Sequence, residues 1–186
     1  MNSYFSACGQ KDKLRSLVQK NTVLDIHCRE GEDLRQAIQL GASRVVGLIP
    51  PFEYKQQDRQ PPGSMEIRPG DPETDDLSEP YDVVLAHRVL EYARDPVGLL
   101  DKLRKIPRRH LLVSLPTYKD PVIRSMLQRV GCPALFQPLL SRLPVTIAGW
   151  MEEPHSTSRQ LPRFYISLNG LTRMLLEHEP SWASVD

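Results

Sequence analysis

The stretch VLDIHCREGEDL, residues 23–34, decides the fold. It opens with an apolar run of the length expected for a strand that is buried on both faces. It then turns and continues with Leu34, Ala37 and Ile38, which have the spacing of a helix. Acidic residues fill the first turn of that helix, and Gly41 follows as a C-terminal stop. The stretch therefore predicts a strand, a tight turn and a helix.

The same alternation continues along the chain. We expect strands at 22–28, 43–49, 81–87 and 110–116, a weaker strand at 64–69, and helices at 11–20, 30–42 and 95–106. Such an order predicts an α/β fold, a Rossmann-like doubly wound and mainly parallel sheet with helices on both faces. Ligands bind at the carboxyl ends of the strands in such sheets. We therefore expect one crevice, surrounded by residues 25–31, 47–53, 70–76 and 86–92.

Composition excludes several classes of protein. The chain has 24 basic and 23 acidic residues, a balance that attracts neither nucleic acid nor an anionic membrane. Its three cysteines are far apart and lack CxxC spacing, which argues against disulfides and against a metal site. No apolar run approaches the roughly 20 residues of a membrane span, and the N-terminus does not resemble a signal peptide. We expect a cytoplasmic protein.

Several segments in a fixed order resemble the class I S-adenosylmethionine-dependent methyltransferases. VLDIHCREG is similar to that family's VLDIGCGxG, RVVGLIP to xVxGxDxS, and PGDPETDDL to the stretch with GDaxxL. YDVVLAHRVLEYARDPVGLLDKLRKI resembles FDVVxxxxVLEHxxDPxxxLxxLxRx, and ISLNGLTRMLLE resembles a late helix of the family. A dinucleotide dehydrogenase shares the architecture but needs GxGxxG, of which this turn has only Gly31.

The resemblance implies that S-adenosylmethionine would bind around the first turn. Asp25 and Gly31 match the family pattern, in which the aspartate helps to fix the turn. Asp71 stands where the family contacts the adenine, although capping its own turn explains it equally well. The resemblance thus places six residues at the cofactor: Asp25, His27, Arg29, Gly31, Ile49 and Asp71.

Three of these residues depart from the family. His27 and Arg29 replace glycines that let the backbone approach the ligand closely. Both side chains can be cationic and would repel the cofactor's sulfonium, although Arg29 could instead pair with its carboxylate. Ile49 replaces the acidic residue that binds the ribose, and an isoleucine accepts no hydrogen bond.

His87, at the end of the expected strand 81–87, is the candidate catalytic residue. A histidine there could act as general base toward a hydroxyl or amine acceptor. The alternative is a partly buried or solvent-facing histidine without a chemical role.

We expect a single domain, residues 1–186, with a proline-rich helical insertion at about 117–165, where the family often binds its acceptor. The family's sheet commonly ends with an antiparallel hairpin, which we do not expect here after the last helix. The sheet would then end at an edge that must be covered. A homo-oligomer or a protein partner would bind through 117–165 or through that C-terminal sheet edge, and a dimer is one solution.

Two functions remain. The first is a methyltransferase-like pseudoenzyme with a degraded S-adenosylmethionine site, serving as a non-catalytic binding or scaffold subunit. The second is an active, divergent methyltransferase that acts on a small molecule or a sugar, and in which Asp25, Gly31 and Asp71 hold the cofactor.

Overall fold

The computed structural model describes residues 11–28, 31–54, 65–115, 124, 128, 146–152, 160–166, 169 and 171. Contacts divide the chain into two compact units. The first comprises Met1–Val89 with Gly98–Ser114, and the second comprises Leu90–Val97 with Leu115–Asp186. The single domain that we expected stays a prediction.

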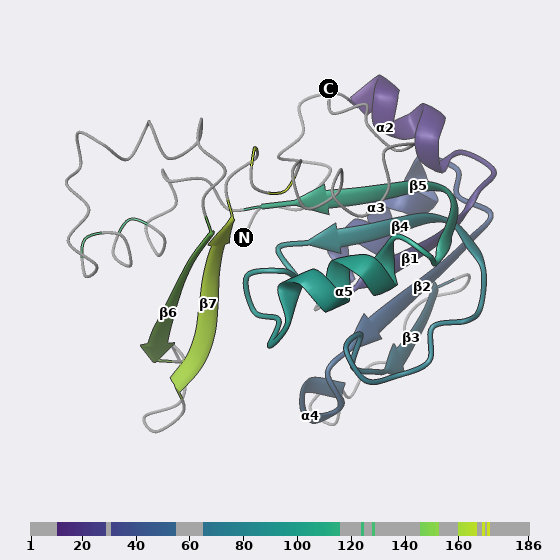
Figure 1. The fold of residues 1–186 in the computed structure, drawn as a ribbon. Coiled ribbons are helices and arrows are strands. Elements are labelled where there is room, and N and C mark those ends of the chain that lie inside the picture. Colours follow the sequence, from purple (N-terminus) through teal and green to yellow (C-terminus); the bar gives the residue numbers. More distant parts are fainter. Residues whose placement is uncertain are drawn as a thin grey trace. The chain divides into compact units, whose positions relative to one another are not determined.

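The first unit is built around a five-stranded parallel sheet (Figure 1). Its strands are β1 (Thr22–Ile26), β2 (Arg44–Ile49), β3 (Met65–Pro69), β4 (Tyr81–His87) and β5 (Pro107–Ser114). They lie in the order β3-β2-β1-β4-β5, so that the chain reverses its direction across the sheet between β1 and β4. The predicted parallel sheet is confirmed, and β5 begins three residues earlier than expected, at Pro107.

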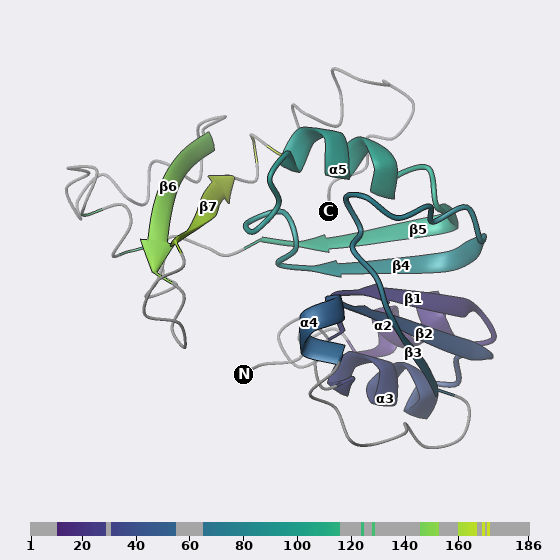
Figure 2. The same ribbon diagram turned by 90° about the horizontal axis from the view of Figure 1, so that it is seen from below.

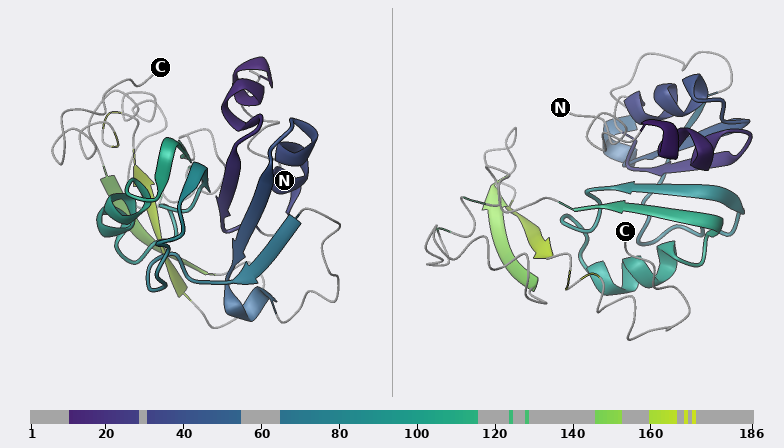
Figure 3. Two further views of the ribbon diagram at one scale, coloured as in Figure 1. Left: turned by 90° about the vertical axis from the view of Figure 1, so that its right-hand side faces the viewer. Right: turned by 90° about the horizontal axis from the view of Figure 1, so that it is seen from above.

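Helices cover both faces of this sheet. They are α2 (Lys11–Val18), α3 (Glu32–Gln39), the short α4 (Pro51–Tyr54) and α5 (Pro96–Leu103). Figures 2 and 3 show α2 and α3 on one face and α5 on the other. Pro96 begins α5, a position where its missing N–H costs nothing. The doubly wound arrangement predicted from the sequence is therefore present.

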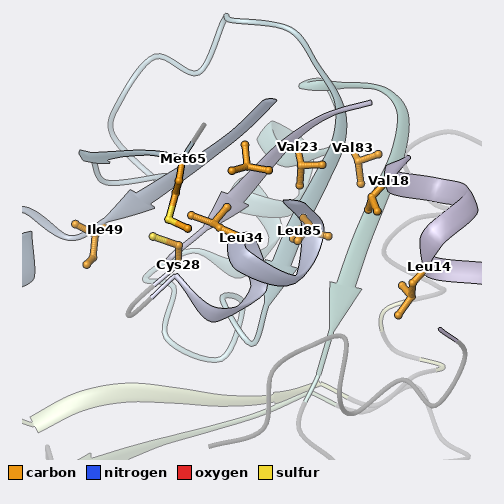
Figure 4. Packing of buried hydrophobic residues seen from close by; sticks show 11 residues of the cluster. Leu14, Val18, Val23, Cys28, Leu34, Ile49, Met65, Val83 and Leu85 are labelled. Atoms are coloured by element: carbon orange, nitrogen blue, oxygen red, sulfur yellow. The ribbon is translucent and has the colours of Figure 1, made fainter. Parts of the chain in front are cut away.

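The core between the sheet and helices α2 and α3 follows from strand alternation. Side chains two residues apart on a strand share a face, so alternate residues of β1, β2 and β4 point toward these helices. Figure 4 shows the resulting apolar cluster, which includes Leu14, Val18, Val23, Leu34, Val45, Ile49, Val83 and Leu85. The intervening residues Leu24, Ile26, Val46, Leu48, Val84 and Ala86 are also buried, on the opposite face. Burial on both faces explains why these strands are continuous apolar runs.

The second unit contains an antiparallel pair of strands, β6 (Thr146–Glu152) and β7 (Gln160–Ile166). They pair from Thr146 with Ile166 to Glu152 with Gln160. We expected a helical insertion at 117–165. This expectation is wrong where β6 and β7 fall within that range, whereas Arg124 and Gln128 are helical. The remainder of that range lies outside the described residues.

The antiparallel strands that the structure describes do not join the main sheet, and the expected lack of a hairpin after the last helix stays a prediction. Within the described part of the chain, the five-stranded sheet has only parallel neighbours, and β6 and β7 form a sheet of their own. From the sequence, only FYIS at 164–167 was a possible short strand, because Pro162 lies within β7 and prolines usually argue against a strand.

Candidate functional site

The turn after β1 is held against the end of β2 by its backbone. The Cys28 N–H donates to the carbonyl of Leu48 at 2.8 Å, and the Gly31 N–H donates to the carbonyl of Cys28 at 2.8 Å. His27 has a φ of 68°, in the left-handed region that favours glycine. The turn therefore keeps a glycine-like backbone while carrying an imidazole. Arg29 lies outside the described residues, so its predicted proximity to the cofactor stays a prediction.

Gly31 ends the turn and caps α3. Its φ of 72° is left-handed, and a Cβ at this position would lie 3.3 Å from Met65 Sδ. The Arg35 N–H donates to the Gly31 carbonyl at 2.9 Å, which starts the helix. Conformation and crowding thus both favour glycine here, and neither requires a ligand.

Asp25 is buried at the end of β1, with 2% of its surface exposed. Among the residues that the structure describes, its Oδ2 atom has no hydrogen-bond partner. Burial, and secondarily the charge of the nearby Asp33, raise the pKa of Asp25 well above its ordinary value. The protonated, neutral acid is therefore favoured, which weakens any role for Asp25 as an anion.

Ile49 ends β2 within the apolar core. Its side chain is 1% exposed and belongs to the cluster that contains Cys28 and Met65 (Figure 4). Its carbonyl accepts the Gly70 N–H at 2.9 Å, an interaction that extends the contact between β2 and β3. Ile49 is thus a packing residue at the strand tip where the resemblance places a ribose-binding acid.

Asp71 is part of a turn that directly follows β3. Its Oδ1 atom accepts the Glu73 N–H at 2.9 Å, and its carbonyl accepts the Asp75 N–H at 2.9 Å. The Asp71 N–H in turn donates to Asp75 Oδ2 at 2.9 Å. Lys102 of α5 steadies the same turn by donating from Nζ to the Glu73 carbonyl at 3.3 Å. The structure therefore documents the turn-capping interpretation of Asp71, and its contact with adenine stays a prediction.

His87 ends β4 beside Ser114, its register partner on β5. Its Nδ1 atom lies 2.7 Å from Ser114 Oγ. The Arg88 N–H donates both to the Ser114 carbonyl at 3.1 Å and to Ser114 Oγ at 3.2 Å. Arg88 has a φ of 58° and, like His27, is a non-glycine residue in the left-handed region.

The two histidines come to the same edge of the sheet. Asp25 of β1 pairs in register with Leu85 of β4, so His27 and His87 each follow by two residues at the strand tips. Sequence reasoning named both histidines but missed Ser114 and Arg88. A residue-by-residue prediction of the parallel pairing between β4 and β5 would have placed Ser114 beside His87. No feature of the local sequence indicates the left-handed backbone of Arg88.

The described ranges offer neither a metal site nor a membrane span. Within them, no three His, Cys, Asp or Glu side chains gather as a metal ion would require. None of the described helices is long and apolar enough to cross a bilayer.

Comparison with known proteins identifies the fold. No family model and no curated protein matches the sequence. Among solved structures, an S-adenosylmethionine-dependent methyltransferase from Mesorhizobium loti is 15% identical, with a TM-score of 0.59 over 92% of this chain and 81% of that one.

Two further structures are similar. The glycopeptide N-methyltransferase MtfA is 13% identical, with a TM-score of 0.60 over 92% of this chain and 77% of its own. The N-terminal domain of EvdMO1, solved with S-adenosylhomocysteine (SAH) and D-fucose, is 15% identical, with a TM-score of 0.57 over 91% and 70%. These similarities show that the first unit's parallel sheet is that of the class I methyltransferase-like fold.

Proposed function

We propose that this protein is a methyltransferase-like pseudoenzyme with a degraded S-adenosylmethionine site, and that it serves as a non-catalytic binding or scaffold subunit. The observation that carries this proposal is the burial of Ile49 at the tip of β2. Its side chain is 1% exposed and packs in the core, so it offers the cofactor's ribose no acceptor.

The energetic consequence of Ile49 is large enough to matter. Each hydroxyl buried without a partner costs roughly 1–3 kcal/mol. Two such hydroxyls would weaken binding by about one to four decades, at about 1.4 kcal/mol per decade. S-adenosylmethionine would then bind here only weakly.

The first turn supports the same conclusion. His27 adds a side chain at a left-handed position where glycine would leave room for a ligand. Asp25 is favoured as a neutral acid because burial and Asp33 raise its pKa. A neutral acid beside an imidazole offers little attraction to a sulfonium. The residues present therefore fit S-adenosylmethionine poorly.

A non-catalytic subunit needs a surface for its partner. In the described sheet, β5 is the last strand on its side, and its residues Leu111, Leu112 and Val113 are only partly buried. An edge strand has backbone N–H and C=O groups that can pair with a further strand. Residues 117–165 or this sheet edge would provide the contact, either to a second copy or to a protein partner.

Calorimetric titration of the full chain with S-adenosylmethionine and with SAH tests the proposal. SAH lacks the sulfonium charge but keeps the ribose. If the missing ribose acceptor at Ile49 is the main obstacle to binding, neither compound binds in the micromolar range. If repulsion between the sulfonium and the cationic side chains of the first turn is the main obstacle, only SAH binds. Micromolar binding of S-adenosylmethionine contradicts the proposal.

One observation favours the second candidate, an active divergent methyltransferase acting on a small molecule or a sugar. Asp25 Oδ2 is a buried carboxyl oxygen with no hydrogen-bond partner among the described residues, and a ligand could satisfy it. Substitution of Asp25 by asparagine separates the two functions. An active enzyme would lose cofactor affinity, whereas a degraded site would show no binding before or after the change.

A further inference from the structure

The loop that follows β3 closes on itself. The Asp71 N–H donates to Asp75 Oδ2, and the Asp75 N–H donates to the Asp71 carbonyl, both at 2.9 Å. Inside this ring, Asp71 Oδ1 accepts the Glu73 N–H at 2.9 Å. Gly70 leaves room for the closure, since a Cβ there would lie only 3.2 Å from Asp75 Oδ2. The result is a closed loop, the 71–75 loop, at the carboxyl end of β3, the edge at which open α/β sheets bind ligands.

The 71–75 loop concentrates negative charge. Asp71, Glu73, Asp75 and Asp76 lie within six positions of the sequence, and no basic residue lies among them. Carboxylates held this close together repel one another. Closing the loop also brings backbone carbonyl oxygens, which carry partial negative charge, into the same small region. A cation placed at the loop would therefore stabilise its closed form.

Lys102 of α5 supplies such a cation. Its Nζ atom donates to the carbonyl of Glu73 at 3.3 Å and also to the carbonyl of Asp75. One ammonium group thus bridges two carbonyls of the loop. Hydrogen bonds from a charged donor are stronger than those between neutral groups. Lys102 is partly buried, so solvent ions screen its charge less than they would screen an exposed lysine.

We propose that Lys102 is a latch, in which the ammonium group acts as an internal cation that holds the 71–75 loop closed, so that loss of this charge opens the loop. Without a cation, the carboxylates repel one another and the two carbonyls lose their shared donor. Opening separates Asp71 from Asp75 and turns their hydrogen-bonding groups toward solvent at the edge where ligands bind. This inference goes beyond the proposed function and does not depend on it.

Nuclear magnetic resonance of the ¹⁵N-labelled full chain tests the latch in the wild type. Hydrogens of a lysine ammonium group exchange rapidly with water unless they are held in hydrogen bonds. Loss of one ammonium signal in Lys102→Arg assigns the residue. We expect the Lys102 ammonium to exchange about tenfold more slowly than that of the exposed Lys105, a difference equivalent to about 1.4 kcal/mol. Equal exchange at the two lysines overturns the proposal.

Variants of Lys102 test whether its charge closes the loop. Lys102→Met removes the charge and keeps an unbranched side chain. The amide hydrogens of Asp71, Glu73 and Asp75 should then exchange about tenfold faster than in wild type, whereas those of the core strand β2 should keep their rates. Lys102→Arg keeps the charge and should keep most of the protection. Lys105→Met removes a charge only three residues away and is the matched control.

Three results reject the latch. The first is an unchanged exchange rate of the loop amides in Lys102→Met. The second is an equal gain in Lys102→Met and Lys102→Arg, which would show that charge is not what closes the loop. The third is a common acceleration of the loop and of β2, which would show that Lys102 supports the whole fold. If Lys102→Met does not fold, the exchange of the ammonium group in the wild type still decides the proposal.

Discussion

Gly47 of β2 lies directly against Cys28 of the first turn. A Cβ added at position 47 would stand 2.4 Å from Cys28 Sγ and 2.6 Å from Leu34 Cδ1. These separations are far below van der Waals contact, so the turn approaches β2 only because residue 47 has no side chain. The glycine that lets the chain pass close to its neighbour is thus on the second strand, whereas positions 27 and 29 of the first turn are occupied by histidine and arginine.

Gly47→Ala should destabilise the fold by about 1–3 kcal/mol, the usual cost of overpacking a core. Urea unfolding followed by circular dichroism measures the change. In a Cys28→Ala background the same substitution should cost less, because the nearest clash is gone. It should still cost something, since Leu34 Cδ1 and the Cβ of residue 28, at 2.6 Å and 2.8 Å, remain in place. Equal costs in the two backgrounds would show that Cys28 Sγ is not the atom that limits position 47.

The raised pKa of Asp25 leads us to expect an unusual dependence of stability on pH. Its folded-state pKa is raised above the unfolded value, by burial first and by Asp33 second. Its contribution to stability is therefore fully present below the unfolded pKa of about 3.9 and is lost as pH rises through the folded pKa. Asp25→Asn removes this ionisation, so the stability of the variant relative to wild type should increase with pH.

Unfolding free energies between pH 4.5 and pH 9 check this prediction. The gap between the curves should widen by at most about 1.4 kcal/mol per pH unit, the slope for one proton. Asp12→Asn, at an exposed aspartate of α2, is the control. Parallel curves for Asp25→Asn and wild type would show that folding does not raise the pKa of Asp25, which would contradict the prediction.

The opposite pH dependence is expected at Glu79. Hydrogen bonds from Arg44 first, and then from Tyr81, lower the pKa of Glu79 from 4.5 to about 2. Its contribution to stability is therefore present above pH 4.5 and is lost as pH falls toward about 2. Its side chain is 36% exposed, so solvent screening keeps the contribution below about 1 kcal/mol.

Acid titration of the unfolding midpoint should show this effect as a shallower decline for Glu79→Gln than for wild type between pH 4.5 and 2. Asp76→Asn, at an exposed carboxyl of the same loop, is the matched control. A decline identical to wild type would show that the ion pairs of Arg44 and Arg68 with Glu79 contribute nothing measurable in solution.

The fold was predictable because its signals are local. The apolar runs around Val23, Val45 and Val83, the stop at Gly41 and the proline at 96 each mark an element without knowledge of its neighbours. Of the strands β6 and β7, only the FYIS stretch at the end of β7 was considered as a strand, because Pro162 within β7 is a residue that usually argues against one.

The site was only partly predictable, for a related reason. Sequence patterns located Asp25 and Ile49 near the ends of their strands and Gly31 in the turn, where the structure places them, while their contact with a cofactor stays a prediction. The state of Asp25 depends on burial and on Asp33, and the setting of His87 depends on Ser114, 27 residues away. Such properties arise from tertiary contacts that a single sequence does not display.

Ile49 provides the last prediction. Ile49→Asp places a carboxylate in the apolar core and should cost several kcal/mol without ligand, because an unpaired buried charge is expensive. If Ile49 is what excludes the ribose, S-adenosylmethionine should restore part of that loss. A ligand at 100 times its dissociation constant stabilises by about 2.7 kcal/mol. His27→Gly and Arg29→Gly should be added to open the turn.

Thermal unfolding with and without the cofactor measures this rescue. Wild type and Ile49→Val should show no ligand-dependent shift, since valine keeps the apolar contact at a cost of only about 0.5–1.5 kcal/mol. A shift confined to the variants that carry Ile49→Asp would show that the site is degraded at this residue. A shift of similar size in wild type would mean that the ribose finds its acceptor elsewhere, and that Ile49 does not prevent binding.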